Sequence, residues 1–240
     1  PPSAGCSTRT AAESRGNTLR PSEKPGRITP VADLIYPTNV SLDGYAAGDH
    51  ITLDEPIGGA GELFGNFDGR VIAGVQNADA PISADRVFSS VWGQGVGVEI
   101  MGRGKFGPQQ GEWPDDGWRG WWEDEPPFQT PVIVLTHHER EPITFDNGTV
   151  FHFVDASPAK ALELALDLAE GRDVRIGGGP STVNQFLRDD LVDFMHLSIN
   201  PIVLGGGVSL WSGLGGIHTR FDIESVPTST GLIHQFWNRK

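Results

Sequence analysis

The chain has 240 residues, of which 38% are hydrophobic, and a formal net charge of -13. This length and composition allow one well-buried core, and no change in composition after residue 33 marks a second domain. The acidic balance argues against binding to nucleic acid or to an anionic membrane surface, because both need clustered Lys and Arg. A small anionic ligand is still compatible with this charge, provided that backbone N–H groups and a few local cations face it.

The sequence also limits the available chemistry. The only cysteine is Cys6, which excludes an intrachain disulfide and leaves the folded part without a thiolate zinc site or a cysteine nucleophile. No run approaches the roughly 18 apolar residues of a membrane helix, and the first residues lack the apolar stretch of a secretory signal. We therefore expect a cytoplasmic protein whose partner is a small molecule.

Residues 1–30 are rich in Ser, Thr, Arg, Gly and Pro and contain almost no large apolar side chains. Such a segment cannot offset the entropy cost of ordering, so we expect a disordered leader followed by one domain at residues 31–240. A transit peptide is the alternative interpretation, but the acids Glu13 and Glu23 and the absence of an amphipathic face argue against it.

From Val31 onward, short apolar runs alternate with helical segments, which is typical of an α/β sheet. The predicted strands are residues 34–36, 97–101, 131–135, 150–154, 174–176, 194–199 and 201–204, and residues 217–226 with 232–237 form a closing antiparallel hairpin. These elements predict a mainly parallel sheet with an antiparallel edge.

Three helices are predicted between these strands, and they are expected after Ser83, from Pro158 to Gly171, and at residues 182–187. Ser83 and Ser157 are N-cap candidates, because a serine oxygen can accept a hydrogen bond from an unpaired amide of the first turn. Val87, Phe88 and Val91 are expected to form the buried face of the first helix.

A triple-glycine turn separates a buried strand from the third helix. It consists of Gly177, Gly178 and Gly179 and is followed by Pro180, which is expected near the first position of the helix, and by Ser181 and Thr182, with Gln185 one helical turn beyond Ser181. Glycines permit positive φ and close ligand approach. The unpaired N–H groups and the positive dipole end of the helix suit a pyrophosphate. A structural turn is the alternative, and the motif matches neither a P-loop nor a Rossmann fingerprint.

Two further polar clusters follow predicted strands. Gly102, Arg103 and Lys105 follow one strand, and the arginine fork matches a phosphate ester. Thr136 and His137 follow another strand and offer a hydroxyl and an imidazole. Each cluster alone could be a solvated loop. Together with the glycine turn they agree with the rule that ligands bind outside the carboxyl ends of parallel strands.

Five segments resemble, in this order along the chain, motifs of the dihydrofolate-reductase-like superfamily: residues 39–45, 101–103, 134–137, 176–182 and 201–207. The resemblance is strongest to the branch of the riboflavin-biosynthesis reductase domain, which is the C-terminal domain of a bacterial bifunctional deaminase-reductase. It runs from about residue 33 to the C-terminus. It implies an α/β fold with a mixed, mainly parallel sheet of about eight strands, flanking helices and a C-terminal antiparallel hairpin. It also implies NADPH as hydride donor and, frequently, a homodimer.

The resemblance assigns cofactor roles residue by residue. Gly102 and Arg103 would flank the adenine-side phosphates with help from Lys105, and Thr136 and His137 would lie near the 2′-phosphate. The pyrophosphate would be held by Gly177, Gly178, Gly179, Pro180, Ser181, Thr182 and Gln185, and the nicotinamide would be bordered by Ala47 and Gly48.

The resemblance also assigns a substrate pocket, formed by Asn39, Ser41, Asp43, Leu204 and Gly205. Asp43 is the candidate catalytic residue, an acid that orients substrate or relays a proton. The alternative is that Asp43 is simply the Asp-Gly turn residue that ends a strand.

The expected function is an NADPH-dependent reductase that transfers a hydride to a C=N or C=O bond, similar to 5-amino-6-(5-phosphoribosylamino)uracil reductase. Folate is a poor substrate candidate, because the chain lacks the Trp-x-Leu-Pro-x-Asp pattern of true dihydrofolate reductases. The zinc deaminase domain of the bifunctional enzyme is not found either. The alternative function is a non-catalytic module that binds a dinucleotide or a phosphorylated metabolite.

Two other segments carry alternatives. Trp118, Trp121 and Trp122 have helical spacing, so we expect them to form the buried face of a short helix rather than a sugar-binding platform. Residues 137–141 contain metal-capable side chains without the histidine spacing of a zinc helix, and we expect no metal. His196 lies in an apolar strand and is interpreted as a core histidine with its hydrogen bonds satisfied.

Overall fold

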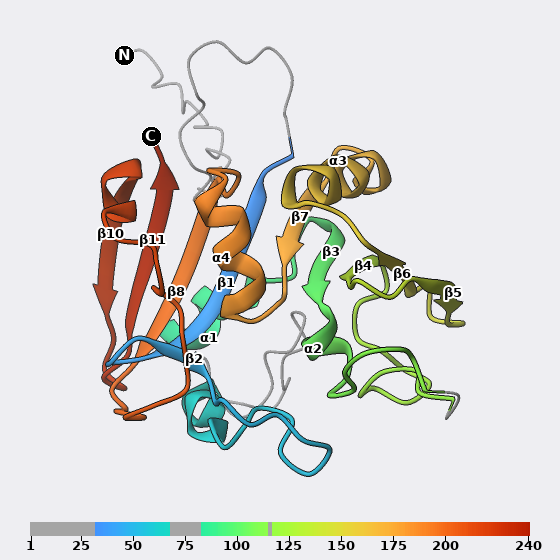
Figure 1. Ribbon diagram of the computed structural model, residues 1–240. Helices are drawn as coiled ribbons and strands as arrows, with labels where there is room; N and C mark the ends of the chain where they lie inside the picture. The colour runs from blue at the N-terminus through green and yellow to red at the C-terminus, as the bar shows by residue number, and fades with distance from the viewer. Residues whose placement is uncertain (1–31, 68–82, 115–116) are drawn as a thin grey trace, which may run out of the picture.

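The computed structural model describes residues 32–67, 83–114 and 117–240 (Figure 1). The predicted leader at residues 1–30 lies outside the described residues. The arrangement confirms the expected dihydrofolate-reductase-like α/β class, a large and mainly parallel sheet with helices on both faces.

The described residues form one nine-stranded sheet in the order β10-β11-β8-β1-β7-β3-β4-β6-β5. Its strands are β1 (Leu34–Ser41), β3 (Val96–Gly102), β4 (Pro131–Leu135), β5 (Arg140–Thr144), β6 (Val150–Val154), β7 (Asp173–Ile176), β8 (Phe194–Asn200), β10 (Phe221–Pro227) and β11 (Ile233–Arg239). The six strands from β8 to β6 are parallel, whereas β10, β11 and β5 supply the antiparallel pairings. The C-terminal hairpin was predicted, but β5 was not.

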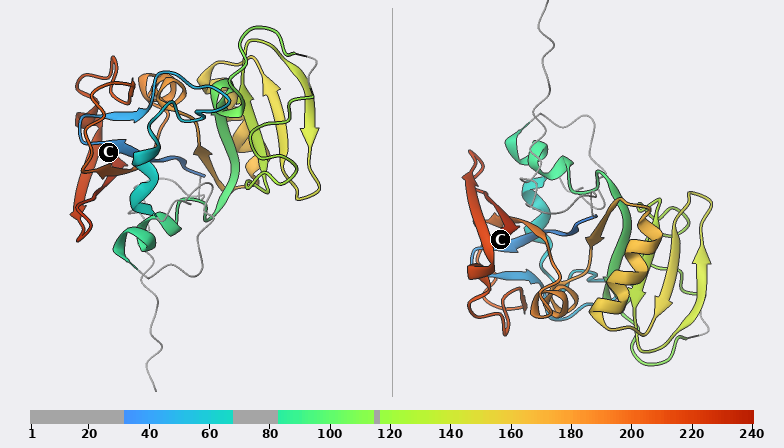
Figure 2. Two further views of the ribbon diagram at one scale, coloured as in Figure 1. Left: turned by 90° about the horizontal axis from the view of Figure 1, so that it is seen from below. Right: turned by 90° about the horizontal axis from the view of Figure 1, so that it is seen from above.

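Helices α3 (Pro158–Ala169) and α4 (Pro180–Arg188) cover one face of the sheet (Figures 1 and 2). Both predicted N-termini are confirmed, since Ser157 caps α3 through the amide of Lys160 and Pro180 occupies the first turn of α4. Three alanines of α3 are fully buried and let the helix lie close to the strands, while α4 inserts the ring of Phe186. This face holds the main hydrophobic core.

Helix α1 (Ala84–Ser90) and the 3-10 helix η1 (Gly61–Phe67) lie on the opposite face (Figure 2). Ser83 caps α1 as predicted, but the predicted buried face is only partly correct, since Phe88 packs on His234 and Phe236 whereas the two valines are exposed. Val87 and Val91 are 54% and 50% exposed, and Asp85 is buried in their place. The reason is that the Asp85 carboxylate accepts hydrogen bonds from His234 and Thr230, which outweighs the apolar pattern of the helix.

Three further expectations fail. Residues 201–204 form a loop rather than a strand, residues 217–220 form the 3-10 helix η2 (Ile217–Arg220), and residues 117–130 contain no helix. The tryptophans of this last segment are still partly buried, because Trp122 stacks on Phe151 and the Trp118 indole donates to the carbonyl of Phe106. Contacts between aromatic rings, rather than a helix, therefore bury these tryptophans. A second, small sheet of β2 (Tyr45–Ala47) and β9 (Val208–Ser209) was not predicted.

Strands β1 and β7 diverge toward their carboxyl ends. They pair only at Leu34 with Val174 and at Ile35 with Arg175, whereas β1 pairs with β8 along seven positions, from Ile35 to Ser41. Among the described residues, the second half of β1 therefore has no strand neighbour on its β7 side. We call this region, between β1 after Ile35 and the end of β7, the β1–β7 opening.

Candidate functional site

The carboxyl ends of the parallel strands lie at one edge of the sheet, which is the edge seen from below in Figure 2. This edge places the glycine turn after β7, Gly102 at the end of β3 and Thr136 directly after β4. Since β7, β3 and β4 are consecutive neighbours in the sheet, three of the sequence clusters predicted as cofactor-binding come together along one rim.

Gly102 and Thr182 bring the β3 cluster and the glycine turn into contact. A Cβ atom added to Gly102 would overlap the hydroxyl oxygen of Thr182, and one added to Gly178 would lie 3.0 Å from Cβ of Thr182. A glycine at each of these positions allows the start of α4 to rest on the end of β3. The two motifs, which are distant in sequence, thus form one surface.

The expected reason for the three glycines is only partly correct. None of Gly177, Gly178 and Gly179 has a positive φ, so the turn does not depend on that freedom. Gly177 is needed because a side chain there would overlap the carboxylate of Glu99. Gly179 has nothing within 4 Å of an added Cβ, so the space beside it is open. The close approach of the Glu99 carboxylate therefore explains why a glycine is needed at position 177, whereas the space beside Gly179 is open to a ligand.

The start of α4 can hold an anion. Gly179 is its N-cap with φ -74° and provides no side-chain cap. Within the described part of the chain, the amides of Gly178, Gly179 and Ser181 donate no hydrogen bond. Unpaired amides at the positive end of a helix attract phosphate oxygens. Gln185 donates to the carbonyl of Ser181 at 3.0 Å, which places its amide on the same side of the first turn.

A buried charge cluster lies beneath the glycine turn, and we call it the Glu99 cluster. Glu99 accepts hydrogen bonds from Lys105 Nζ at 2.8 Å and from Arg175 Nε at 2.8 Å, and Arg175 also donates to the carbonyl of Trp92. The Glu99 and Arg175 side chains are 1% and 8% exposed, and that of Lys105 is 29% exposed. The cluster therefore has two cations for one buried anion, and of the three side chains only that of Lys105 is partly exposed.

The pKa values in this cluster have opposing causes. Burial alone would raise the pKa of Glu99, but the charges and hydrogen bonds of Arg175 and Lys105 hold it below the ordinary value. Burial lowers the pKa of Lys105, and the attraction of Glu99 only partly offsets this. The sequence analysis found Lys105 but missed Glu99 and Arg175. A charged residue within each apolar strand was the signal that could have found them.

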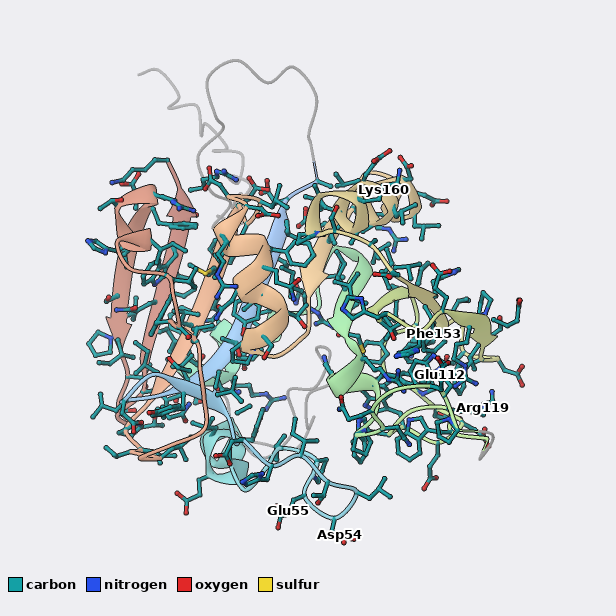
Figure 3. The ribbon with its side chains drawn as sticks, in the orientation of Figure 1. Asp54, Glu55, Glu112, Arg119, Phe153 and Lys160 are labelled. Atoms are coloured by element: carbon teal, nitrogen blue, oxygen red, sulfur yellow. The ribbon has the colours of Figure 1, made fainter. Side chains whose placement is uncertain are left out.

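Arg103 lies in the short helix α2 (Arg103–Phe106), and its guanidinium faces the loop at residues 111–113 rather than the glycine turn. It lies 3.7 Å from the ring centroid of Trp113 and donates to the carbonyl oxygens of Gly111 and Glu112. Trp113 in turn packs on Phe153, so this loop is held against β6; Glu112 and Phe153 are labelled in Figure 3. The guanidinium is therefore fixed on the β4 side of the rim.

The loop after β4 is joined to Trp113 and Glu112, the same loop that Arg103 contacts. The indole of Trp113 donates to the carbonyl of His138, and His138 Nδ1 lies 3.0 Å from Glu112 Oε1. Thr136 is buried, and its hydroxyl accepts from the amide of His138, whereas the side chain of His137 is 91% exposed. The structure thus connects Arg103 and Thr136 through Trp113 and His138.

Asp43 lies at the exposed turn after β1, where its carboxylate holds the loop at residues 201–207. It accepts hydrogen bonds from the Ser41 hydroxyl at 2.6 Å and from the amides of Gly205 and Leu204 at 2.8 and 3.2 Å. The bond from Ser41 and the two amides hold the pKa of Asp43 below its ordinary value. The carboxyl group is therefore ionised at neutral pH. This geometry favours the turn-residue interpretation over proton relay.

The structure gives Ala47 and Gly48 a packing role, whereas the sequence analysis expected them beside the nicotinamide. A Cβ atom on Gly48 would overlap the carbonyl of Gly58, and one on Gly207 would overlap the carbonyl of Ala47. These residues pack the β2 segment against its neighbouring loops. The contacts explain why small residues are needed there and leave their role beside a nicotinamide as a proposal.

A second polar network is buried under α1. Asp85 Oδ1 lies 2.8 Å from His234 Nε2, His234 Nδ1 lies 2.9 Å from His196 Nε2, and the Trp92 indole donates to His196 Nδ1 at 2.6 Å. Because an indole N–H can only donate, His196 must donate through Nε2 to His234, which then donates to Asp85. His196 is therefore a satisfied core histidine, as expected. Burial and the neighbouring His234 lower its pKa to about 3.

This network predicts acid sensitivity. Unfolded His196 takes up a proton below its ordinary pKa of 6.5, whereas the folded side chain resists protonation down to about 3. The free energy of unfolding should therefore fall as the pH drops from 6.5, by up to about 1.4 kcal/mol per pH unit for one such group. Urea titrations at several pH values between 7 and 4.5 measure this slope. His196→Gln should flatten it, and His137→Gln, at an exposed side chain, should not. Equal slopes in all three proteins would contradict this origin.

A cavity of about 240 Å³ lies near the end of β1, lined by Val40, Ser41, Leu42, Gly44, Leu197, Ile199, Trp211, Gln235 and Trp237. Trp211 and Trp237 stack on each other and belong to the core on the α4 face.

The described residues contain no helix long and apolar enough to cross a membrane. They also contain no cluster of three or more His, Cys, Asp or Glu side chains that could hold a metal ion.

Comparisons with known proteins agree with this geometry. A family model for the RibD C-terminal domain matches residues 32–233. The uncharacterized protein YwjB of Bacillus subtilis is 34% identical over 56 residues, which span 23% of this chain and only 32% of YwjB.

Solved structures show the same fold. A Shewanella sp. PV-4 protein assigned to riboflavin biosynthesis superposes with a TM-score of 0.53 and 24% identity, covering 87% of this chain and 99% of that one. Form 1 of Acinetobacter baumannii RibD superposes with a TM-score of 0.50 and 16% identity, and 88% of this chain covers 59% of RibD. This chain therefore spans little more than half of that protein.

Proposed function

Since the chain belongs to the RibD C-terminal domain family, we propose that it is an NADPH-dependent reductase acting on a small heterocyclic or carbonyl substrate. The observation that carries the proposal is the rim itself. The open space at Gly179, the unpaired amides at the start of α4 and the cluster around Arg103 follow one another along neighbouring strand ends. A dinucleotide needs such a row of phosphate-compatible groups.

The residues present fit this cofactor. The amides of Gly178, Gly179 and Ser181 would hold the pyrophosphate, and Arg103 with Thr136 and His137 would hold the 2′-phosphate. When bound, NADPH would supply a hydride for a C=N or C=O bond, as in an aminouracil reductase. Asn39 and Ser41 would line the substrate side, and Ala47 and Gly48 would border the nicotinamide.

The chain's own groups then position the reactants and manage the proton. Asp43 would keep Leu204 and Gly205 in place at the substrate side rather than donate a proton, because its carboxylate is ionised and already accepts three hydrogen bonds. Lys105 is better suited to hold a proton near the glycine turn, since its side chain is partly exposed and burial lowers the pKa of its ammonium.

Titration with NADPH and NADH, followed by fluorescence or calorimetry, tests the cofactor assignment. We expect wild type to bind NADPH more tightly than NADH. Arg103→Ala should weaken NADPH by roughly tenfold or more, because a charged hydrogen bond is lost, while NADH affinity changes little. Arg119→Ala is the matched control, since Arg119 is exposed, and its guanidinium lies over the ring of Phe145 and donates to the carbonyl of Thr144 at the end of β5. Equal affinities for both dinucleotides in wild type would contradict the 2′-phosphate site.

One observation favours the second candidate, a non-catalytic module that binds a dinucleotide or a phosphorylated metabolite. Of the carboxyl groups described at the rim, Asp43 and Glu99 both have lowered pKa values, so neither is a general acid at neutral pH. Oxidation of NADPH in the presence of pyrimidine, pterin and carbonyl compounds separates the two functions. Binding without turnover of any of them would favour the module.

A homodimer and a cytoplasmic location stay predictions.

A further inference from the structure

The cavity of about 240 Å³ near the end of β1 has no role in the proposed function. It is lined by residues of β1, β8 and β11, which are neighbours toward the β10 end of the sheet, and by Gly44 and Trp211 from the adjoining loops (Figure 1). No residue of β7 or of the glycine turn lines it, and it shares only Ser41 with the proposed substrate side. The cavity is therefore separate from the β1–β7 opening.

The lining of this cavity carries no charged side chain, although the chain has a formal net charge of -13. Its walls are aliphatic side chains of β1 and β8 and the stacked rings of Trp211 and Trp237, whose centroids lie 5.3 Å apart. Leu42 lines the cavity and is 61% exposed, which places its entrance at the turn after β1. A charged ligand would lose its water here without gaining a partner, so the lining selects an uncharged one.

Both side-chain oxygens of the lining already accept a hydrogen bond. Gln235 Oε1 accepts from the Trp237 indole at 3.1 Å, and Ser41 Oγ accepts from the amide of Tyr45 at 2.9 Å. A ligand that brings its own N–H or O–H into the cavity would therefore bury a donor without an unengaged side-chain acceptor, which is costly.

The indole N–H of Trp211 is the polar group of the lining that lacks a partner. In the part of the chain that the structure describes, Trp211 donates only through its backbone amide, to Ser209. A Cβ atom added to Gly44 would lie 3.3 Å from Cδ1 and 3.7 Å from Nε1 of Trp211, so the N–H edge of the ring lies beside another wall residue. Since a buried indole N–H usually finds an acceptor, a ligand is expected to supply one.

We infer that this cavity binds an uncharged, flat molecule of about two fused rings that carries a hydrogen-bond acceptor and no donor. The size follows from the volume, because a dry protein cavity of about 150 Å³ is large enough for benzene. The flat shape follows from the stacked tryptophans, since aromatic rings pack favourably on one another in offset or edge contacts. The acceptor would bond to the indole N–H of Trp211.

A ligand at this site would join two segments of the chain. Leu42 and Gly44 belong to the turn after β1, which Asp43 holds against the loop at residues 201–207, and Trp211 belongs to the segment that follows β9. Binding to the folded protein alone raises the melting temperature. We therefore expect occupancy of the cavity to stabilise the protein and to leave the cofactor rim accessible.

The test compares quinoline and indole, two uncharged fused-ring compounds of nearly equal size, by calorimetric titration and thermal unfolding. Quinoline carries a ring nitrogen that accepts a hydrogen bond, whereas the indole ring carries only a donor. Wild type should bind one quinoline and melt at a higher temperature in its presence. Indole should bind at least tenfold more weakly, and saturating NADPH should leave the quinoline affinity unchanged.

Two pairs of variants locate the site. Ile199→Phe places a larger side chain in the wall and should abolish quinoline binding, whereas Ile223→Phe is the matched control, at a 39% exposed isoleucine outside the cavity. Trp211→Phe keeps an aromatic ring and removes the N–H, so quinoline affinity should fall about fivefold, the effect of one neutral hydrogen bond. Trp121→Phe, at a partly buried tryptophan outside the cavity, should change nothing.

The outcomes separate clearly. Quinoline binding that is lost in Ile199→Phe and kept in Ile223→Phe, with both variants showing a single cooperative unfolding transition, supports the inference. Wild type that binds no quinoline overturns it, and so do equal affinities of wild type and Ile199→Phe or displacement of quinoline by NADPH. Equal affinities of wild type for indole and quinoline overturn the requirement for an acceptor.

Discussion

Replacement of Gly179 by Asp is expected to abolish NADPH binding while the fold stays intact. Gly179 is the N-cap of α4 with an ordinary φ of -74°, and an added Cβ meets nothing within 4 Å. Aspartate is a better N-cap than glycine by a few tenths of a kcal/mol, so α4 should be slightly more stable. The same carboxylate would stand where the pyrophosphate is proposed to bind, and charge repulsion there should weaken NADPH by about 100-fold or more.

The measurement is an NADPH titration combined with thermal unfolding of the ligand-free protein. Gly179→Asn is the matched control, because asparagine caps a helix about as well as aspartate and carries no charge. It should keep the melting temperature of the aspartate variant and lose much less affinity. Undiminished NADPH binding by Gly179→Asp would show that the start of α4 is not the pyrophosphate site.

The Glu99 cluster is expected to give the largest stability effect in the protein. Glu99→Met leaves the buried guanidinium of Arg175 facing Lys105 without an anion between them. Removal of one partner from a buried ion pair typically costs about 3–5 kcal/mol. The free energy of unfolding from urea titration should fall by this order, and Lys105 should turn toward solvent.

The double variant Glu99→Met/Arg175→Met distinguishes unpaired charge from lost packing. Replacing both members of a buried pair by apolar side chains is often nearly neutral, so the double variant should recover most of the stability lost in Glu99→Met. A double variant that is less stable than Glu99→Met would mean that shape, rather than charge, makes these two residues necessary.

Helix starts were predictable from sequence because their signals are local. Ser83, Ser157 and Pro180 occupy the cap and first-turn positions that were assigned to them, since capping needs only residues within one turn. The buried face of α1 was predictable only in part. Its apolar pattern indicated Val87, Phe88 and Val91, of which Phe88 packs inward. The rest of the face was decided by Asp85, whose partner His234 lies 149 residues away in sequence.

The candidate site divides in the same way. The positions of the glycine turn, Gly102 and Thr136 after strands could be predicted, and parallel pairing then brought them to one rim. The reason why a glycine is needed at each of these positions could not be predicted. Gly177 depends on the Glu99 carboxylate and Gly102 on the Thr182 hydroxyl, and both contacts form only after distant segments pack. Asp43 shows the same limit, because its hydrogen bonds to the amides of Leu204 and Gly205 span more than 160 residues.

The sequence by itself determined the α/β class, most strands of the large sheet, the helices α1, α3 and α4 and the polar clusters at strand ends, because hydrophobic periodicity, glycine and caps act over a few residues. Only the tertiary structure decided that β1 and β7 diverge and that Arg103 stacks on Trp113. Those features arise where segments distant in sequence meet, and pairing and burial at such places depend on the whole sheet.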